Sequence, residues 1–507
     1  MMNVLLLSAL LLHSHTTASS PTHVIVISRH GVRTPYSPTG GDLKPEAFRP
    51  YSTRWKEFPV TSKEWGVPTI EGQLLTDHGK VVIAHMGKYF SKYYANLLSD
   101  DLDCERDLYF YADNCTRDVQ TATEFLSGLS TTCYNAGGAS RISQKGATIL
   151  FNQGAYRTET CTLPPRSEMD ALLGGSQNSY SAYRSAHSSF VQDIQDVIDC
   201  CSGSSLCDGN VPCTLGEIPT HYQGEIWGPV NGPVYLSGYF ASYFTLAALN
   251  NMSLGLPNAQ RTLSEITSWY HESGSTLDVV DGAPSSPSFA STLASHIIAS
   301  LQQSATGKSV DALAHGPDTK FVYMAGHDTN LVLLRTLLDL TWLADGWKRN
   351  DPAPGGMLVF ELYAADDTDD DTDGGNDHQV EIFFQVATPK QIRNAETLNA
   401  DSNPPSRTPV LLPGCRTLRC PLTNVTQIML EQINNECVLL PALQTYVNEL
   451  AKQNEPGEAE MAPGWAFIVG AVGLVLLTAA IVAPLTIFFV KRSDRRRDSG
   501  SYLLGDN

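Results

Sequence analysis

The chain has 507 residues, of which 53 are Asp or Glu and 34 are Lys or Arg, and its formal net charge is −19 at pH 7. So acidic a chain argues against a nucleic-acid partner, and it makes any cluster of arginines within it conspicuous. The length exceeds that of a typical single domain and predicts a two-part architecture.

Residues 1–20 predict a secretory signal peptide. They read MMNVLLLSALLLHSHTTASS, an apolar block followed by small polar residues. The alternative is an N-terminal core segment, but so short an apolar block, unable to span a bilayer, is typical of a signal peptide. The 11 cysteines all lie between Cys104 and Cys437, which suits an oxidising compartment.

Strand-like and helix-like patterns alternate along the chain. Apolar runs typical of buried strands occupy 23–28, 107–112, 321–325, 357–363 and 379–385. Patterns with a period near 3.6 residues predict helices over 76–98, 118–129 and 329–340. Strands that alternate with helices predict an α/β fold, with a sheet flanked by helices on both faces.

The middle of the chain differs from the parts on either side. Residues 151–300 are mostly helical and loop-like in pattern, which predicts an inserted cap between two core segments at 21–150 and 301–453. Four cysteines crowd a Ser/Gly-rich stretch of this cap and indicate a locally stapled loop: Cys200, Cys201, Cys207 and Cys213. Their spacing lacks the CxxC pairs of a zinc site.

Residues 357–385 predict a hairpin whose tip is the acidic loop 366–377. The run from Asp369 to Gly374 matches the first half of a calcium-binding loop. Its twelfth position is Val380 where such a loop needs Glu, and no helices flank it. A solvated hairpin tip is therefore the better interpretation.

The C-terminal part predicts a membrane anchor. Residues 465–490 carry no charge and are long enough to span a bilayer. The linker 454–464 precedes this segment, and the basic tail 491–507 follows it, which places the tail in the cytosol. Together with the signal peptide, this predicts a single-pass type I membrane protein of the secretory pathway, with its catalytic part lumenal (endosomal or lysosomal) or at the cell surface.

Unusual cationic residues follow three of the predicted strands. Arg29, His30 and Arg33 come after HVIVIS, Arg117 comes after the run 107–112, and His327 with Asp328 comes after FVYMAG. Ligands of open α/β sheets bind beyond the carboxyl ends of the strands, so we expect these side chains to converge. Each could be a surface or capping residue on its own. Three arginines in one small volume are tenable around an anion, and guanidinium fits phosphate oxygens best.

At these residues the chain resembles the histidine acid phosphatases, the larger-domain branch of the histidine phosphatase superfamily. RHGVRTP is similar to the family signature, and MAGHDTN is similar to its histidine–aspartate motif. Three further segments resemble the family in the same order: GQLLTDHG, ADNCTRDVQTA and LLPGCRTLRCPL. The resemblance implies a phosphoglycerate-mutase-like mixed sheet with a helical cap, and the predicted anchor makes the chain similar to the membrane-bound acid phosphatases.

The resemblance also implies the chemistry. His30 would be the nucleophile that forms a phosphohistidine, and Asp328 would be the proton donor. Arg29, Arg33, Arg117 and His327 would bind the phosphate. Neighbouring cations lower the pKa of His30 and keep it neutral at acidic pH. We therefore expect a metal-free acid phosphatase without cofactors that acts on small phosphomonoesters, and the family makes a homodimer an open question.

Family pairing implies two disulfides, Cys161–Cys437 and Cys415–Cys420, and leaves the other cysteines unassigned. Sequons predict glycans at Asn251 and Asn424. The sequon at Asn114 is doubtful, because it lies three residues before Arg117 and so close to the expected pocket.

Two alternatives to a broad acid phosphatase stay open. A specialised relative acting on inositol polyphosphates or lysophosphatidate would use the same phosphate site, but a phytase-like cap would need many basic residues. The predicted cap has few, such as Arg157, Arg166 and Arg184. A receptor on an inactive phosphatase scaffold is disfavoured, because every residue that the family motif requires is present.

Overall fold

The structure is a computed structural model of the chain. It describes residues 20–38, 40–69, 74–99, 101–151, 161, 167, 170–171, 181–201, 206, 213–225, 228–254, 256, 286–365 and 377–454. Residues Met1–Ala451 form one compact unit and Lys452–Asn507 form a second. Nearly all of the described residues belong to the first unit.

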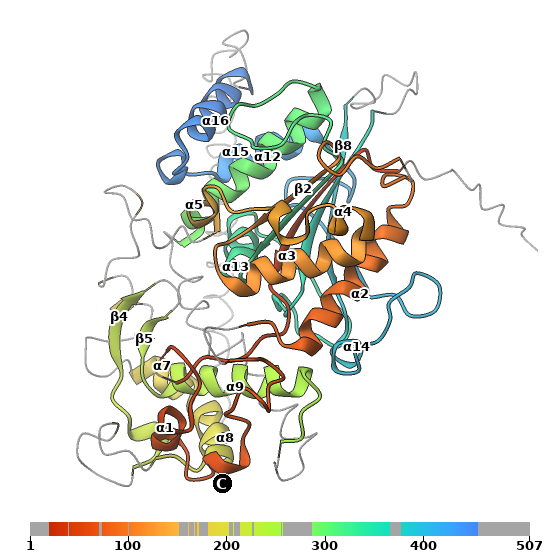
Figure 1. Cartoon of the computed structure of the whole chain (residues 1–507). Helices are drawn as coiled ribbons and strands as arrows, with labels where there is room; N and C mark the ends of the chain where they lie inside the picture. The colour runs from red at the N-terminus through yellow and green to blue at the C-terminus, as the bar shows by residue number, and fades with distance from the viewer. Residues whose placement is uncertain are drawn as a thin grey trace, which may run out of the picture. The chain divides into compact units, whose positions relative to one another are not determined.

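An eight-stranded mixed sheet lies at the centre of the first unit (Figure 1). β1 (His23–Arg29) and β2 (Leu108–Ala112) each pair in parallel with β6 (Phe321–Gly326). β7 (Met357–Tyr363) runs antiparallel along the other side of β1. The strand order is β10-β8-β7-β1-β6-β2-β3, with β9 paired to β8. The carboxyl ends of β1, β2 and β6 therefore meet at one edge of the sheet.

The hydrophobic core lies on both faces of this sheet, because successive side chains of a strand point to opposite sides. Val26 of β1 packs with Phe125 of α3 (Thr116–Leu129) in a first hydrophobic cluster. Ile27 packs with Leu334 of α13 (Asp328–Leu337) in a second cluster on the opposite face. The helices of the first cluster are α2 (Asp77–Tyr93) and α3 (Thr116–Leu129). Those of the second are α12 (Ser291–Thr306), α13 (Asp328–Leu337) and α15 (Leu422–Gln432). The predicted α/β class, a mixed sheet with helices on both faces, is confirmed.

The central part of the chain supplies a second set of helices, which we call the cap helices. They are α7 (Ser181–Ala186), α8 (Ser188–Ile198) and α9 (Pro233–Leu249). Phe240 and Tyr243 of α9 contact Phe48, with ring centroids 5.4 and 5.2 Å apart. Phe48 ends α1 (Pro45–Phe48), so a helix that begins ten residues after the end of the RHGVRTP motif packs on the cap helices.

The remaining elements are short or peripheral. The other strands are β3 (Ile142–Ser143), β4 (His221–Glu225), β5 (Gly228–Asn231), β8 (Gln379–Val386), β9 (Ser406–Val410) and β10 (Cys420–Pro421). The other α-helices are α4 (Thr131–Asn135), α5 (Ala147–Phe151), α14 (Pro389–Arg393) and α16 (Pro441–Asn454). Short 3-10 helices are η1 (Arg49–Tyr51), η2 (Trp55–Glu57), η3 (Gly138–Arg141), η6 (Leu215–Glu217), η7 (Ser286–Ala290) and η8 (Asn435–Cys437). β7 and β8 form the predicted antiparallel hairpin, and residues 366–376 of its acidic loop lie outside the described residues.

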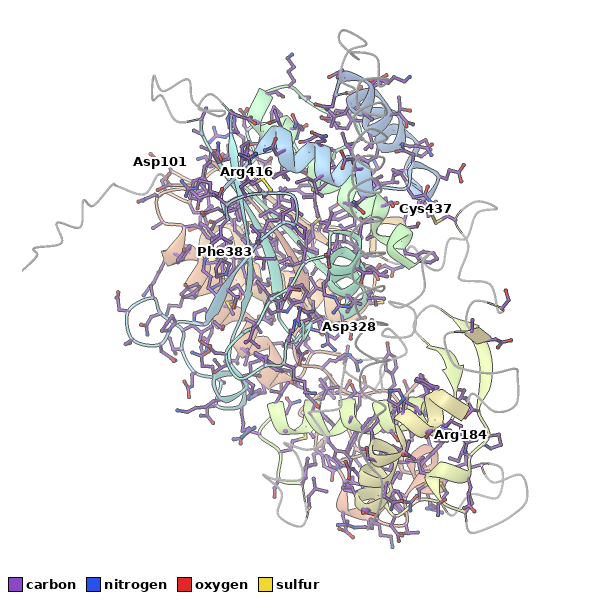
Figure 2. All side chains as sticks on the ribbon, turned by 180° about the vertical axis from the view of Figure 1, so that it is seen from behind. Asp101, Arg184, Asp328, Phe383, Arg416 and Cys437 are labelled. Carbon is purple, nitrogen blue, oxygen red and sulfur yellow. A yellow bond between two sulfur atoms is a disulfide. The ribbon has the colours of Figure 1, made fainter. Side chains whose placement is uncertain are left out.

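Disulfides of the described residues range from one between adjacent cysteines to one that joins segments 276 residues apart. Cys161 pairs with Cys437, and Cys415 pairs with Cys420, as the family pairing implies. Figure 2 places Cys437 beside the helices that cover the second face of the sheet. Two further pairs with both cysteines among the described residues were not assigned from the sequence: Cys104–Cys133, and the adjacent cysteines 200 and 201 of the predicted stapled loop.

The predicted localisation, a single-pass type I membrane protein, is corrected. Within the described ranges, no helix is both long and apolar enough to cross a membrane. The apolar segment 465–490 on which the prediction depended lies outside the described residues, as do residues 1–19 of the predicted signal peptide. Hydropathy and length alone suggested the span from the sequence.

Candidate active site

The ends of the three parallel strands bring the predicted site residues together. Arg29 is the last residue of β1, and His30 follows it directly. Arg117 lies in the first turn of α3, which follows β2, while His327 caps the N-terminus of α13, which follows β6. A helix N-terminus adds unpaired N–H groups and partial positive charge. The same edge of the sheet therefore carries both the cationic side chains and the start of a helix.

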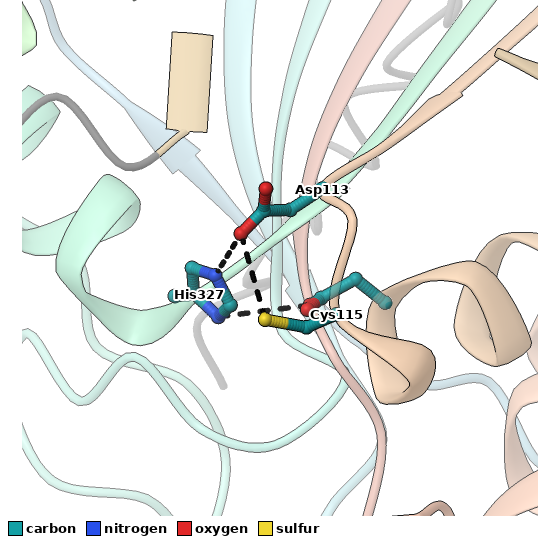
Figure 3. A group of neighbouring side chains, drawn as sticks. Asp113, Cys115 and His327 are labelled. Atoms are coloured by element: carbon teal, nitrogen blue, oxygen red, sulfur yellow. Dashed lines mark hydrogen bonds and ion pairs between the residues drawn. The ribbon is translucent and has the colours of Figure 1, made fainter. Parts of the chain in front are cut away.

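His327 is held from two sides (Figure 3). Its Nε2 lies 2.7 Å from Oδ2 of Asp113, and its backbone N–H donates to Oδ1 of Asn330 at 2.8 Å. Burial alone would lower its pKa, but the Asp118 charge and the Asp113 hydrogen bond overcome this and raise it to about 9. The shift favours the cationic form of His327 below neutral pH, which requires Nδ1 to stop accepting from the Arg117 guanidinium, a group that only donates.

His30 is buried and oriented by its own backbone. Its Nδ1 lies 2.9 Å from the carbonyl oxygen of Gly31, and its backbone N–H donates to the carbonyl of Gly326 at 2.9 Å. Because a carbonyl only accepts hydrogen bonds, this contact assigns the proton of the neutral ring to Nδ1. Nε2 then carries the lone pair and is the nucleophilic nitrogen.

The pKa of His30 lies well below its usual value. Burial contributes most to this shift, followed by the charges of Arg117, Arg33 and Arg29 and that of His327. A charged imidazole would be both desolvated and repelled by its neighbours. His30 therefore stays neutral at a pH where a free histidine is protonated.

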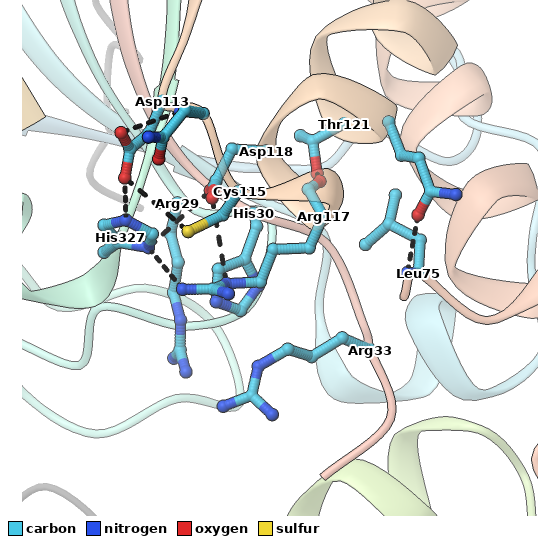
Figure 4. A network of polar contacts seen from close by, with 12 residues as sticks. Arg29, His30, Arg33, Leu75, Asp113, Cys115, Arg117, Asp118, Thr121 and His327 are labelled. Carbon is cyan, nitrogen blue, oxygen red and sulfur yellow. Dashed lines mark hydrogen bonds and ion pairs between the residues drawn. The ribbon is translucent and has the colours of Figure 1, made fainter. Parts of the chain in front are cut away.

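Three arginines surround His30 (Figure 4), and all three are at least nine-tenths buried. Arg29 donates from Nη1 to the carbonyl of Pro352 at 2.8 Å, and its Nη2 lies 2.9 Å from Oδ2 of Asp328. Arg33 donates to the Thr34 carbonyl at 2.8 Å. Nη2 of Arg117 lies 3.0 Å from Nδ1 of His327. Guanidinium groups held in this way form a ready binding site for a phosphate dianion.

Two acidic residues of the site were missed from the sequence. Asp113 follows β2 directly, so the rule that ligand-binding residues follow strand ends could have found it. Asp118 lies in the first turn of α3 and resembles an ordinary acid at a helix start. It is fully buried, and burial raises its pKa to about 6, although His327 and Arg117 oppose the shift.

Four potential metal ligands meet at the same place. One donor atom from each of Asp113, Cys115, Asp118 and His327 lies within 4.8 Å of the others. Cys115 is a free cysteine and the middle residue of the Asn114 sequon. No metal site was predicted here, because the four residues come from two segments that are far apart in sequence.

The sequons remain predictions. Asn114, Asn251 and Asn424 all have exposed side chains. The doubt about Asn114 came from its closeness to Arg117, but the Arg117 side chain is buried whereas that of Asn114 faces outward.

The sequence of this chain is similar to those of known phosphatases. The sequence model of the histidine phosphatase superfamily (branch 2) matches residues 22–385. Phytase AppA of Escherichia coli (strain K12) is 26% identical over 456 residues, which cover 82% of this chain and 93% of the relative. A glucose-1-phosphatase of Salmonella typhimurium is 24% identical over 448 residues, which cover 84% and 96% respectively.

Solved structures share the fold. The phytase from Citrobacter braakii superposes with a TM-score of 0.64 at 22% identity, covering 83% of this chain and 100% of the phytase. The apo form of Hafnia alvei phytase gives a TM-score of 0.63 at 19% identity, covering 82% and 98%. The family match, the relatives and the strand-end geometry agree: the chain belongs to the histidine phosphatase superfamily (branch 2) and is a phosphatase of that superfamily.

Proposed function

We propose that this phosphatase is an acid phosphatase, which hydrolyses phosphate monoesters through a covalent phosphohistidine on His30. The observation that carries the proposal is a neutral, buried imidazole whose Nε2 is free of the Gly31 contact and is surrounded by three guanidinium groups. Such a nitrogen is nucleophilic at acidic pH, and the charges around it attract the substrate that it attacks.

In the first step, the lone pair of His30 Nε2 forms a bond to phosphorus and the bond from phosphorus to the ester oxygen breaks. Arg29, Arg33, Arg117 and His327 bind the phosphoryl oxygens and neutralise their charge. Asp328 gives its proton to the departing oxygen, so the product leaves as an alcohol. Asp328 is 23% exposed and sits at the N-terminus of α13, where an incoming substrate can reach it.

In the second step, water attacks the phosphohistidine and the bond between phosphorus and Nε2 breaks. Asp328 takes a proton from this water, which restores the acid for the next cycle, and inorganic phosphate leaves. The arginines and His327 supply the positive charge that a metal supplies in other phosphatases, so the proposed reaction needs no metal.

We propose a broad range of small phosphomonoester substrates. Within the cap helices, the basic residue that the structure describes is Arg184 (Figure 2). Its guanidinium donates to the backbone carbonyl of Gly216, and a substrate with many phosphates would need more basic residues than this. Arg157 and Arg166 lie outside the described residues. The relatives named phytase and glucose-1-phosphatase favour a second candidate, a specialised sugar or inositol phosphatase with the same phosphate site.

The first test is the substitution His30→Ala. We expect turnover of p-nitrophenyl phosphate to fall by at least about 1000-fold, because no other group forms the covalent intermediate. Circular dichroism and thermal unfolding should show an intact fold. The control is His85→Gln, a histidine on α2 outside the site. Retained activity in His30→Ala would remove His30 from the role of nucleophile.

A substrate survey separates the two candidates. The wild-type protein is assayed at pH 4 to 8, with and without EDTA, on p-nitrophenyl phosphate, glycerol phosphate, glucose 1-phosphate, phytate and lysophosphatidate. A broad phosphatase acts on most of these with similar kcat/KM and an acidic optimum. A value for a single substrate that is higher by about 100-fold or more would favour the specialised candidate.

A further inference from the structure

We propose that the four-residue group beside the phosphate pocket is a site for a thiophilic divalent cation such as Zn²⁺, and that this cation inhibits the enzyme. We call this group the Asp/Cys/His cluster, and it consists of Asp113, Cys115, Asp118 and His327. It lies where the ends of β2 and β6 meet the starts of α3 and α13 (Figure 3).

Two of the distances within the cluster match those between the ligands of one ion. Bonds of about 2.0–2.3 Å place the donors of a tetrahedral zinc site roughly 3.3–3.8 Å apart. Sγ of Cys115 lies 3.8 Å from Oδ2 of Asp113, and Nδ1 of His327 lies 3.7 Å from Oδ1 of Asp118. The 2.7 Å hydrogen bond between Asp113 and His327 uses the other ring nitrogen, Nε2, so Asp113 must move for its carboxylate to bind the same ion as Nδ1.

Asp118 is the independent sign that the cluster is suited to a cation. Its side chain is fully buried, and neither carboxylate oxygen has a hydrogen-bond partner among the described residues. Its contacts with His327 Nδ1 and Arg117 Nε, at 3.7 and 3.8 Å, are too long to be hydrogen bonds. A buried carboxylate without hydrogen bonds is costly, and a bound cation would satisfy it.

The donor atoms select the kind of cation. One sulfur, one imidazole nitrogen and two carboxylate oxygens favour Zn²⁺ and similar metals over Mg²⁺ or Ca²⁺, which prefer oxygen alone. The Cys115 thiol loses its proton on binding, so the ligands would carry a charge of −3 against the +2 of the ion. Three arginines stand nearby and balance the excess negative charge.

Inhibition follows from shared residues. Arg117 contacts both residues: its Nη2 lies 3.0 Å from Nδ1 of His327 and its Nε lies 3.8 Å from Oδ2 of Asp118. An ion bound by His327 and Asp118 displaces this guanidinium and removes His327 from phosphate binding. The inhibition depends on the proposed role of His327, whereas binding of the ion does not depend on any catalytic role.

The experiment uses the full-length protein after treatment with EDTA and dialysis, at pH 7. Isothermal titration calorimetry measures Zn²⁺ binding to the wild type, Cys115→Ser, Asp118→Asn and the control His85→Gln, a half-buried histidine of α2 outside the cluster. Serine keeps the size of the side chain and is a good residue for the start of α3, so Cys115→Ser should fold normally. We expect its Kd to rise by about tenfold or more, with His85→Gln unchanged.

Two further measurements complete the test. Co²⁺ in place of Zn²⁺ should give a near-ultraviolet thiolate-to-cobalt absorption band in the wild type and none in Cys115→Ser. Zn²⁺ should inhibit hydrolysis of p-nitrophenyl phosphate, and EDTA should restore it. The same inhibition of Cys115→Ser should need about tenfold more Zn²⁺. Mg²⁺ and Ca²⁺ should leave the rate unchanged. Equal Zn²⁺ affinity of the wild type and Cys115→Ser, or no thiolate band, would overturn the proposal. A protein that binds the ion but hydrolyses no ester would instead overturn the proposed function.

Discussion

At the scale of single residues, the proposed chemistry depends on a histidine placed where its charged form is unfavourable. His30 lies between Arg29 and Arg33 in sequence and faces Arg117 and His327 in space. His327, only 6.1 Å away between ring centroids, has the opposite shift because carboxylates surround it. The pKa values of two histidines in one pocket thus shift in opposite directions, which favours a neutral His30 for attack and a charged His327 for binding an anion.

The substitution Arg33→Gln tests the electrostatic part of this assignment. Removing a positive charge raises the pKa of His30 towards its ordinary value, so His30 becomes protonated at a higher pH than in the wild type. We expect the acidic limb of the kcat/KM profile to move to higher pH, in addition to a general loss of phosphate affinity. The exposed Arg349→Gln is the matched control. An acidic limb that stays in place would show that the Arg33 charge does not act on His30.

The substitution Asp328→Asn tests the proton donor. An alkyl phosphate needs a proton on its departing oxygen, whereas p-nitrophenolate leaves without one. We expect kcat for glycerol phosphate to fall by about 100-fold or more, and kcat for p-nitrophenyl phosphate to fall much less. Single-turnover rates for both substrates provide the comparison. The same loss for the two esters would assign Asp328 to phosphate binding through Arg29.

The sequence identified the cations of this pocket more completely than the acids. Arg29, His30 and His327 were found because each follows an apolar strand, and the structure brings their side chains together. Asp118 could not be found in this way, because an acid in the first turn of a helix is common and its burial depends on how α3 packs. Whether Cys115 was free also depended on the partners of the other cysteines, which sequence alone does not give.

At the scale of elements, the position of Arg117 depends on a close contact between two helices. A Cβ atom on Gly128 of α3 would overlap the backbone carbonyl of Ala84 in α2, and one on Gly87 of α2 would overlap that of Phe125. The two helices therefore approach each other through glycines. This contact fixes the start of α3, where Arg117 and Thr121 lie and where Thr121 accepts a hydrogen bond from the Gly31 N–H at 3.0 Å.

The substitution Gly128→Ala should therefore destabilise the fold. We expect the free energy of unfolding to fall by about 1–3 kcal/mol, because the added methyl group forces the helices apart. Denaturant unfolding measures the change. Gly316→Ala is the control, since a Cβ atom there meets no atom within 4 Å and the value should stay within about 0.5 kcal/mol of the wild type. A stable Gly128→Ala would mean that α2 and α3 can separate at little cost.

Periodicity predicted most of the core elements to within a few residues, including α2, α3, β6 and β7. Periodicity could not predict the order of the strands in the sheet, because β7 lies beside β1 although more than 300 residues separate them. The packing of α1 on the cap helices was also not foreseen, since its four residues show no period. Such pairings depend on contacts between distant segments, which a local pattern does not encode.

At the scale of the whole molecule, three buried histidines make the fold sensitive to acid. His23 of β1, His296 of α12 and His315 stack with one another and with Tyr109 and Tyr111. Burial lowers the pKa of His23 and of His296 to about 4, and it lowers that of His315 as well. In the unfolded chain these histidines bind protons below about pH 6.5, whereas in the folded chain they stay neutral until about pH 4. The free energy of unfolding therefore falls as the pH is lowered from 6.5 to 4.

The substitution His296→Gln should reduce this loss. We expect the difference in unfolding free energy between pH 7 and pH 4 to shrink by about 3 kcal/mol, which corresponds to a shift in pKa from 6.5 to about 4. Urea unfolding at both pH values measures the difference. His85→Gln, which lies outside the cluster, should keep the wild-type difference. An unchanged difference in His296→Gln would remove this histidine as a source of the acid sensitivity.

The disulfide between Cys161 and Cys437 joins two cysteines that are 276 positions apart in the sequence, one in the predicted cap and one near the last helices on the sheet. A protease that cuts the backbone once at any point between these two cysteines leaves its two products covalently linked. The nicked protein would migrate as one species on a gel until a reducing agent is added. Apparent resistance to proteolysis without reduction is therefore no proof that the chain is uncut.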